Sequence, residues 1–578
     1  MKEELSRKLD NVLEKAGLSS RYQIIMVLLF IFQFTINEYF DIAVPYLDDL
    51  PYVFIPNKLE SQILTFEICD ENIDFKIDKT KTFHSLVVDL EIYCDKTKIN
   101  FIEIGYLISS IFGCFFTYIF ADYLGRKKTI LSLIPINIIS SLIFGFFMFK
   151  NYKFMMGLLM LIGFTNYIIM ITLIIYICEV VEHENIPIFI CLIVSGYVIS
   201  EIIIFICYNI IIKSWQRTTI YYSIFNIFIY LLIFVFLIES PVYNLLNGKI
   251  EEFKDNIKKI AKFNKKNIYL EDFEFLSDFQ EKKKKKNQKK VEKLLINEDE
   301  KEDNENDIFI KSTNSSEVQM EIIDEKNPLS KIVFGKFKMK DYTPFHLIKS
   351  KEQISNFLIL SYIWTACLII KDGINFHKKT FLPNSRENII TLISFFADFI
   401  GFFIILLFFS SGKLLIHPTL VGLQLLSFMV LSFSLIERNR EREIKLIYVS
   451  EVCWNCLYLL LYIITTIIYP SVLRTKGLSI NRGFGKLGTL MGPLYFRERD
   501  NENILILFHL ILAFFSIVFS YGLPRKIDFL IFESNNKENE DKSKDDDDDN
   551  YEEKYQKIMK EKEENIPFKE DNSIGDIN

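Results

Sequence analysis

Long apolar runs recur along this chain, and they limit its fold more than any other feature. Two of them are IMVLLFIFQFTI at 25–36 and FMMGLLMLIGFTNYIIMITLIIYIC at 154–178. A helix needs about 20 mostly apolar residues to cross the hydrocarbon core of a bilayer. Hydrophobic residues make up 50% of the 578 residues, and they are concentrated in such runs. The sequence therefore predicts an all-α protein that crosses a membrane many times.

The apolar runs fall into two sets of six, separated by a long polar segment. We predict spans at 22–42, 101–121, 129–149, 154–178, 188–212, 219–238, 355–374, 387–409, 415–436, 446–468, 474–495 and 504–523. The expected fold is twelve transmembrane helices in two pseudo-symmetric six-helix bundles. The predicted parts are a cytoplasmic segment (1–21), a first bundle (22–239) with an extracellular loop (43–100), a charged cytoplasmic linker (240–354), a second bundle (355–523) and an acidic cytoplasmic tail (524–578).

Lysine and arginine near span ends indicate the orientation, because such residues collect on the cytoplasmic side. Five of them lie in the first 21 residues, three lie together at 126–128, and the linker contains EKKKKKNQKK. Twelve spans place all of these on one side, so we expect both termini and the linker in the cytoplasm. The basic residues at 438–445 fall on the other side. We expect the plasma membrane, with an intracellular organelle membrane as the alternative.

The linker and the tail are rich in charge and poor in apolar residues. Such segments cannot bury enough surface to fold, so we expect 270–330 and 535–578 to be poorly ordered. The alternative role for the lysine run is contact with anionic lipids.

Seven of the nine cysteines lie inside predicted spans, and the other two, Cys69 and Cys94, lie in the loop 43–100. In an oxidising compartment these two are expected to form a disulfide. A zinc site is the weaker alternative, since the loop has only His84 as a further nitrogen ligand. We expect no metal and no cofactor.

Two short polar motifs occupy one end of the first bundle. DYLGRKK at 122–128 has an acid, a glycine and basic residues in a tight turn between spans two and three. Asp122 can accept from a helix N-terminus or an arginine, Gly125 permits the reversal, and Arg126 and Lys127 can stay at the interface. IESPVYNLLNGK begins at 238, where Ser240 and Pro241 can cap and open a new helix.

These motifs resemble the sugar-porter-like branch of the major facilitator superfamily, and more closely its organic cation and organic anion transporter family. Glu239, Ser240 and Pro241 match the ESP of that family's ESPRW motif. LDNVLEKAGLSSRYQ (9–23), DLEIYCDK (89–96), YTPFHLIKS (342–350) and YPSVLRTKGL with GKLGTLMGP (469–493) resemble further family motifs in the same order. The resemblance implies a transporter gated at Asp122, Gly125, Arg126, Lys127, Glu239 and Arg474.

Arg482 and Lys486 lie one helical turn apart in the eleventh span. Charged side chains are unusual inside a membrane, because their burial there is costly. Lys486 lies about 18 Å along the helix from Arg474, and a lysine at that depth does not easily reach water. It must therefore face an internal acid or a water-filled cavity. The resembling family has an acid here in cation carriers and arginine in anion carriers, so lysine implies an anionic substrate. The alternative is an ion pair with Asp398 or Glu451.

Other polar groups at membrane depth extend this hypothesis. Trp364 and Lys371 are expected to contribute to substrate binding, with Arg482 assisting Lys486. Glu201, Asp398 and Glu451 are expected either to couple transport to an ion or to form internal ion pairs.

The chain shows no phosphate-binding loop, no metal-binding helix pattern and no nucleophile elbow, so we expect no enzyme activity. The predicted function is secondary-active or facilitative transport of small organic ions, expected to be anions, by alternating access. The expected partners are such a solute and the lipid membrane, with no nucleic acid. Two alternatives remain open: a porter of sugars or other neutral solutes, and a receptor or scaffold that no longer transports.

Overall fold

The computed structural model describes residues 12–273 and 343–524 with short gaps. The gaps are at 13, 18–19, 56–60, 65–67, 70–73, 79–81, 147–149, 182–184, 213, 270, 350, 382–386, 411–414, 438 and 493–501. The expectation of poor order at 270–330 and 535–578 lies outside the described residues, apart from the short 3₁₀ helix η3 (Glu271–Phe273).

In the described part of its first half, the chain forms six membrane-length helical segments. They are α2 (Arg21–Leu47), α5 (Lys96–Leu124), α6 (Arg126–Phe146), α7 (Tyr152–Val180), the pair α8 (Ile186–Val194) and α9 (Gly196–Ile206), and α10 (Trp215–Phe236). The pair α8 and α9 forms one span, which breaks at Ser195 and ends in a π-helical turn, η2 (Cys207–Ile211). Gly196 makes the break compatible with close packing, because a Cβ there would lie 2.7 Å from the carbonyl oxygen of Ile31 on α2.

The described part of the second half forms six more long helices. They are α14 (Lys351–Phe381), α15 (Glu387–Ser410), α16 (Ile416–Ile436), α17 (Arg440–Ile468), α18 (Ser471–Thr489) and α20 (Glu502–Ser520). In the described part of the chain, nine helices are long and apolar enough to span a membrane. The apolar stretches Phe396–Leu407 and Ile504–Ser520 are shorter, and α18 is polar. The predicted fold class, two bundles of six helices, is confirmed.

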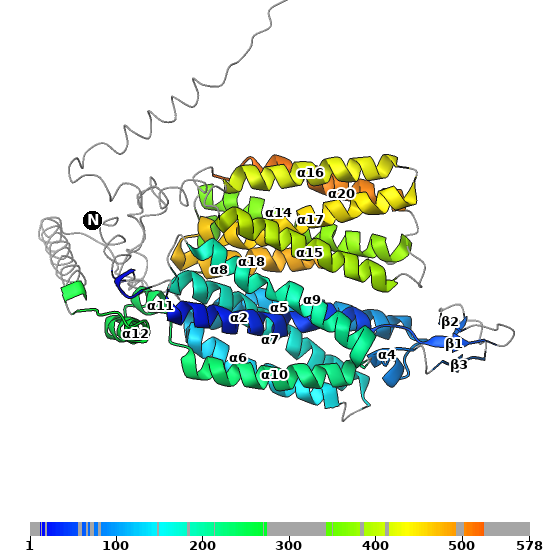
Figure 1. Cartoon of the computed structure of the whole chain (residues 1–578), viewed down its shortest axis with the longest axis horizontal. Coiled ribbons are helices and arrows are strands. Elements are labelled where there is room, and N and C mark those ends of the chain that lie inside the picture. Colours follow the sequence, from blue (N-terminus) through cyan, green and yellow to red (C-terminus); the bar gives the residue numbers. More distant parts are fainter. Residues whose placement is uncertain are drawn as a thin grey trace, which may run out of the picture. The chain divides into compact units, whose positions relative to one another are not determined.

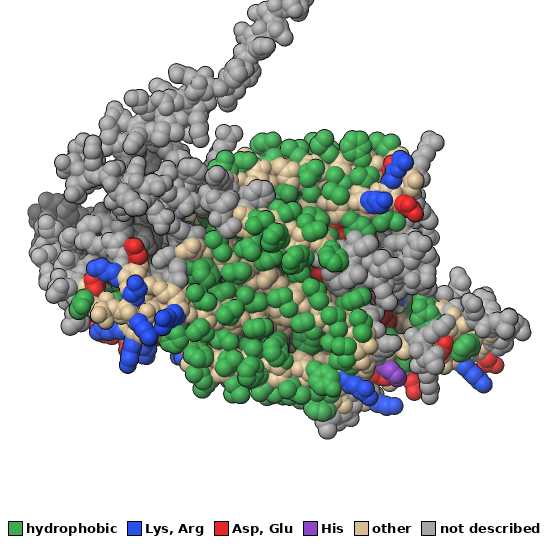
Figure 2. Space-filling view, in the orientation of Figure 1, with side chains coloured by type: hydrophobic (Ala, Val, Ile, Leu, Met, Phe, Trp, Pro, Cys, Tyr) green, Lys and Arg blue, Asp and Glu red, His purple; other side chains and the backbone are tan. Residues whose placement is uncertain are grey.

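The two bundles lie against each other with their helices running in a common direction (Figure 1). On the face that Figure 2 shows, hydrophobic side chains cover the helices, and charged side chains gather beyond the helix ends. A face of this kind suits contact with lipid tails, because a bilayer core offers no partner for charged or polar groups. The arrangement therefore fits a chain with its helices embedded in a membrane.

One end of the first bundle carries a small sheet, and we name it the sheet end. Strands β1 (Tyr52–Phe54), β2 (Gln62–Ile63) and β3 (Lys76–Ile77) pair antiparallel in the order β2-β1-β3. A short helix, α4 (Leu86–Asp89), follows and leads into α5. A disulfide joins Cys69 to Cys94, the pair expected from the sequence, with their Cα atoms 5.7 Å apart. The disulfide therefore holds the loop close to the start of α5.

The opposite end carries α11 (Pro241–Leu246), α12 (Ile250–Phe263) and η6 (Pro344–Ile348), and we name it the α12 end (Figure 1). Ser240 caps α11 by accepting a hydrogen bond from the backbone N–H of Tyr243 at 3.1 Å. The apolar face of α12 packs on Val12 and Ala16 of the N-terminal segment. The segment expected to be a charged linker from residue 240 thus begins with two helices.

Helix α18 lies between the two bundles, packed against α14 on one side and α5 on the other. Its glycines make this close packing possible. A Cβ at Gly488 would lie 2.8 Å from the carbonyl oxygen of Thr365 on α14, and one at Gly483 would lie 2.9 Å from the ring of Phe115 on α5. Because α18 touches both bundles, its charged side chains can bond to either of them.

Candidate functional site

A buried ionic network fills the α12 end of the first bundle. Arg126 of α6 bonds Asp122 of α5 through Nη1 at 3.1 Å and Glu179 of α7 through Nη2 at 2.6 Å. Its Nε also donates to both oxygens of Glu179 at 3.1 and 3.0 Å. The guanidinium carbon lies 4.8 Å from the ring centroid of Tyr243. Arg126 is fully buried, and each of its nitrogen atoms has a partner.

Three contacts connect this network to the second bundle through α18. Lys476 Nζ donates to Asp122 Oδ2, and Arg126 Nη2 donates to Thr475 Oγ1 at 3.2 Å. Arg474 Nη1 donates to the carbonyl oxygen of Cys178 on α7 at 3.3 Å. The bundles are therefore bonded together at the α12 end in this structure.

The turn between α5 and α6 depends on Gly125, which has a φ of +102°. A Cβ there would also lie 2.5 Å from Oε2 of Glu239. Oε1 of Glu239 accepts from the backbone N–H groups of Lys127 at 3.0 Å and Ser240 at 3.1 Å. Burial raises the pKa of the Glu239 carboxyl, and these two hydrogen bonds oppose the shift. Lys127 thus contributes its backbone to the turn, and Glu239 holds the turn against α11.

A second set of charged residues lies deeper between the bundles. Lys486 of α18 forms an ion pair with Asp41 of α2, with 2.8 Å between Nζ and Oδ2. The hydroxyl of Tyr167 on α7 donates to the same carboxylate oxygen, and Lys486 Nζ lies 4.8 Å from the Tyr167 ring centroid. The expectation that any ion-pair partner would be Asp398 or Glu451 is wrong. Because α18 packs on the first bundle, Lys486 meets an acid from that bundle instead.

Arg482, one turn away on α18, is held in a cage of aromatic rings. Its guanidinium carbon lies 5.1–5.7 Å from the ring centroids of Tyr167, Trp364, Tyr458 and Tyr462. Nη2 donates to the Tyr458 hydroxyl at 2.8 Å. Nε and Nη1 are buried without a hydrogen-bond partner among the described residues. Within that part of the chain, no carboxylate lies within ion-pair distance of Arg482.

Trp364 and Lys371 of α14 both reach this region. Trp364 is buried and donates from Nε1 to Thr465 Oγ1 at 3.0 Å, so it serves as a wall of the Arg482 cage. Lys371 Nζ lies 4.2 Å from the ring centroid of Tyr197 and 5.0 Å from that of Tyr458. Contacts of this kind stabilise a cation away from water.

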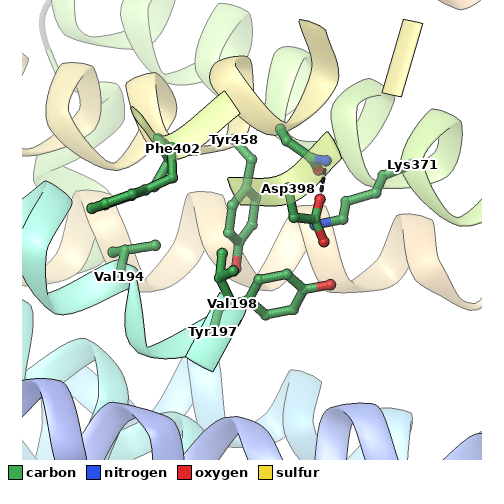
Figure 3. Close-up of a pocket in the computed structure, with 9 residues that line it drawn as sticks. Val194, Tyr197, Val198, Lys371, Asp398, Phe402 and Tyr458 are labelled. Atoms are coloured by element: carbon green, nitrogen blue, oxygen red, sulfur yellow. Dashed lines mark hydrogen bonds between the residues drawn. The ribbon is translucent and has the colours of Figure 1, made fainter. Parts of the chain in front are cut away.

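A small pocket opens beside Lys371, between α8 and α9 of the first bundle and α14, α15 and α17 of the second (Figure 3). It is lined by Val194, Tyr197, Val198, Lys371, Asp398, Phe402, Asn455, Tyr458 and Leu459. Asp398 accepts a hydrogen bond from Asn455 Nδ2. Tyr458 lines the pocket and also bonds Arg482, so one side chain connects the pocket to the cage.

The three acids singled out in the sequence lie at different places around this pocket. Asp398 lines it, while Oε2 of Glu201 on α9 is buried without a hydrogen-bond partner among the described residues. Glu451 is buried on α17.

Sequence reasoning missed four charged residues of the two clusters. Glu179 and Lys476 complete the network at the α12 end, while Glu38 and Asp41 bring carboxylates from α2 to the centre. Glu38 is 1% exposed, and its Oε1 has no hydrogen-bond partner in the described residues. The segment NEYFD at 37–41 held the signal, because an acid inside a membrane span is by default a candidate functional residue.

Comparison with known proteins agrees with this architecture. Residues 68–330, less than half of the chain, match the family model described as "Sugar (and other) transporter". No curated protein matches the chain by sequence.

Two solved structures share the fold at low identity. One is the major facilitator superfamily proton:xylose symporter XylE bound to 6-bromo-6-deoxy-D-glucose, with a TM-score of 0.59, 12% identity, and coverage of 89% of this chain and 98% of that one. The other is the xylose transporter XylE from E. coli in a partially occluded inward-open conformation, with a TM-score of 0.52, 11% identity, and coverage of 87% and 98%. The chain is thus a multi-pass membrane protein with the fold of the major facilitator superfamily.

Proposed function

We propose that this protein transports small organic anions across a membrane by alternating access of its two bundles. The observation that carries the proposal is Arg482, a buried cation between the bundles with two donor nitrogens that bond no described residue. A buried charge without a partner is costly, so such groups in a membrane protein mark substrate or ion sites. A carboxylate would satisfy these donors by charge-assisted hydrogen bonds.

The aromatic cage favours an organic anion over a small inorganic one. Tyr167, Trp364, Tyr458 and Tyr462 surround Arg482 with ring surface that an apolar or aromatic substrate body can contact. Lys371, reached through Tyr458, supplies a second cation on the pocket side. Lys486 contributes less to anion binding in this proposal than in the sequence analysis, because Asp41 already neutralises its charge.

The bonds at the α12 end are proposed as the gate. Asp122, Arg126 and Glu239 shape that end, with Gly125 and Lys127 in the turn, while Lys476 and Arg474 connect it to the second bundle. Opening this side requires that the bonds from Lys476 and Arg474 break. The distribution of basic residues supports placing the α12 end on the cytoplasmic side. The proposed membrane is the plasma membrane or that of an intracellular organelle.

Uptake into proteoliposomes tests the proposal. Purified protein would be reconstituted and offered a panel of aromatic and aliphatic carboxylates, the primary amide of each, and several hexoses and pentoses. We expect at least one carboxylate to accumulate above protein-free vesicles, with its amide at background. Uptake of amides and carboxylates alike would refute selection by charge.

A sugar or other neutral-solute porter is the second candidate, favoured by two observations. The family model matched by residues 68–330 describes sugar and other transporters, and both solved structures named above are of a xylose carrier. In addition, Gln33 Oε1, Asn37 Nδ2 and Glu38 Oε1 on α2 are buried without hydrogen-bond partners in the described residues. Such amide and carboxylate groups suit hydroxyl-rich solutes. If the protein takes up a sugar and none of the carboxylates, the result would support this candidate. If it takes up no solute, the result would favour a receptor or scaffold.

A further inference from the structure

Helix α2 carries a stripe of polar side chains inside the membrane. Gln33, Asn37 and Asp41 follow one another at intervals of four residues, which places them on one side of the helix. Glu38 lies three residues before Asp41, next to this stripe. Gln33, Asn37 and Glu38 are at most 1% exposed. We name these four side chains the α2 polar face.

Helices α2 and α18 run in the same direction. The backbone N–H of Tyr22, near the start of α2, donates to Asn264 Oδ1 at 2.9 Å, and Asn264 caps the C-terminus of α12. Near the start of α18, Lys476 donates to Asp122 of the ionic network at the same end of the molecule. Both helices therefore begin at the α12 end and extend away from it.

The ion pair of Asp41 and Lys486, with 2.8 Å between its atoms, marks a level at which these two helices meet. One turn closer to the α12 end lie Asn37 on α2 and Arg482 on α18, each about 6 Å along its helix from the ion pair. Tyr167 connects the two sides, because its hydroxyl donates to Asp41 and its ring centroid lies 5.6 Å from the guanidinium carbon of Arg482. The α2 polar face and the Arg482 cage thus lie at one depth and share a wall.

Each member of the α2 polar face has a buried polar atom that forms no hydrogen bond within the described part of the chain. These atoms are Gln33 Oε1, Asn37 Nδ2, Glu38 Oε1 and Asp41 Oδ1. Gln33 Nε2 donates to Asn37 Oδ1 at 3.1 Å, so each of the two amides keeps its other polar atom for another partner. Buried polar groups are normally hydrogen-bonded, and a bound molecule can explain four exceptions along about two turns of one helix.

Hydroxyl groups fit this combination of three oxygen atoms and one amide N–H. A hydroxyl both donates and accepts, so it can bond to either kind of atom. An alkyl or aryl body would leave all four atoms without a partner, and an ammonium group could bond only to the oxygens. The rings of the Arg482 cage can cover the C–H surface of the same molecule.

We propose that the transported solute is a polyhydroxylated carboxylate, with its carboxylate on Arg482 and its hydroxyl groups on the α2 polar face. This inference rests on the proposed anion transport and names the class of anion. It accounts for the polar atoms of α2 without a neutral substrate. Because α18 belongs to the second bundle and α2 to the first, such a solute bonds to both bundles. An anion without hydroxyl groups would bond to the second bundle alone.

Four six-membered ring compounds separate the two parts of this proposal. D-Glucuronate has the carboxylate and the hydroxyl groups, cyclohexanecarboxylate has only the carboxylate, D-glucuronamide has only the hydroxyl groups, and cyclohexanecarboxamide has neither. Uptake of each compound into proteoliposomes that contain the full chain would be measured at equal concentration. We expect uptake of glucuronate to exceed that of cyclohexanecarboxylate at least about tenfold, because a site that bonds hydroxyl groups rejects an analogue that lacks them.

Variants of α2 test where the hydroxyl groups bind. Gln33→Met combined with Asn37→Leu removes both amides at once, and we expect the ratio of glucuronate to cyclohexanecarboxylate uptake to fall about tenfold. This ratio does not depend on the amount of folded protein, because both solutes are measured on the same vesicles. Gln424→Met is the matched control. The amide of Gln424 is buried on α16 and donates to Ser516 Oγ at 2.8 Å within the second bundle, so its loss should leave the ratio unchanged.

The outcomes distinguish this inference from the proposal on which it rests. Preferred uptake of glucuronate, with a ratio that falls in the double variant, supports the inference. Equal uptake of the two carboxylates, or an unchanged ratio in the double variant, would overturn the inference and leave anion transport standing. Uptake of glucuronamide at the level of glucuronate would refute selection by charge and thus both proposals. If the double variant yields no protein, the four compounds on the unchanged protein still decide the substrate class.

Discussion

Arg126 and Arg482 are two buried arginines in the same protein, and their surroundings are opposite. Arg126 is fully enclosed, and two carboxylates, a carbonyl and a hydroxyl take up its donors. Arg482 is 2% exposed, has one hydrogen bond to a phenol hydroxyl among the residues that the structure describes, and is surrounded by rings. The satisfied arginine belongs to a network that holds helices together. The unsatisfied one is suited to a ligand that arrives and leaves.

This contrast gives a rule for sorting buried charges in such a chain. Breaking a satisfied pair leaves a charge without a partner, whereas removing an unsatisfied charge removes a cost. Stability and transport should therefore respond in opposite ways at the two positions. The predictions below test that separation.

The largest effect is expected at Arg126. Arg126→Gln leaves Asp122 and Glu179 buried without their cation, and we expect a loss of about 3–5 kcal/mol in the free energy of unfolding. Arg482→Gln is the matched variant and should leave stability unchanged or slightly raised. Thermal unfolding of the two purified variants measures the difference. Equal losses at both positions would erase the distinction between network and site.

The ion pair between Lys486 and Asp41 should show an intermediate effect. Lys486→Ala leaves the carboxylate of Asp41 without its cation, although the Tyr167 hydroxyl still donates to it, and we expect a cost of about 1–3 kcal/mol in the free energy of unfolding. Adding Asp41→Asn removes the unpaired charge and should recover most of the lost surface expression. If the single and double variants express equally poorly, Lys486 does not depend on Asp41. Lys486→Ala combined with Glu451→Gln serves as the control and should give no recovery.

Breaking the connection at the α12 end should change conformation more than stability. Lys476→Ala removes the bond from the second bundle to Asp122, which keeps Arg126 as a partner. We expect Cys178, whose carbonyl oxygen is bonded by Arg474, to react severalfold faster with a maleimide.

Two controls accompany this labelling experiment. Cys456 lies inside the second bundle, where its thiol approaches the carbonyl oxygen of Gly401, and its labelling should not change. Lys259→Ala, on the exposed side of α12, should leave the labelling rate of Cys178 unchanged. Unchanged labelling of Cys178 in Lys476→Ala would mean that this lysine does not hold the end shut.

The smallest effect concerns the pH dependence of stability at Glu239. Burial raises the pKa of its carboxyl in the folded protein above the value in the unfolded chain. The contribution of this carboxyl to the free energy of unfolding is therefore fully present at pH values below its pKa in the unfolded chain. It is lost as the pH rises through its pKa in the folded protein. Glu239→Gln should flatten this part of the curve of melting temperature against pH. A curve that stays parallel to that of the unchanged protein would show that Glu239 does not titrate with folding.

Much of the fold could be predicted from the sequence, because the length and apolar content of a segment indicate a membrane helix. Helix α18 is polar, and the sequence nevertheless predicted a span at 474–495, which overlaps it. Gly125 was likewise expected to permit the turn, and the structure gives it a positive φ. These features are local, so a short stretch of sequence determines them.

The pairing of charges could not be predicted, because it depends on how helices rotate and pack. Lys486 could have faced any acid near the same depth, and only the packing of α18 on the first bundle brings it to Asp41. The rings around Arg482 were equally hidden, since the chain has 28 Tyr and 55 Phe and their positions along a helix do not reveal which ones converge.

Uptake by the Arg482→Gln variant tests the central proposal most directly. Proteoliposomes with the unchanged protein, with Arg482→Gln and with Lys486→Gln would be compared for a transported carboxylate at equal protein content. Loss of charge-assisted hydrogen bonds worth about 1.5–3 kcal/mol corresponds to roughly a tenfold or greater fall in affinity, so we expect Arg482→Gln to reduce uptake at least tenfold while remaining well folded. Full carboxylate uptake by Arg482→Gln would contradict the assignment of this arginine as the anion-binding group.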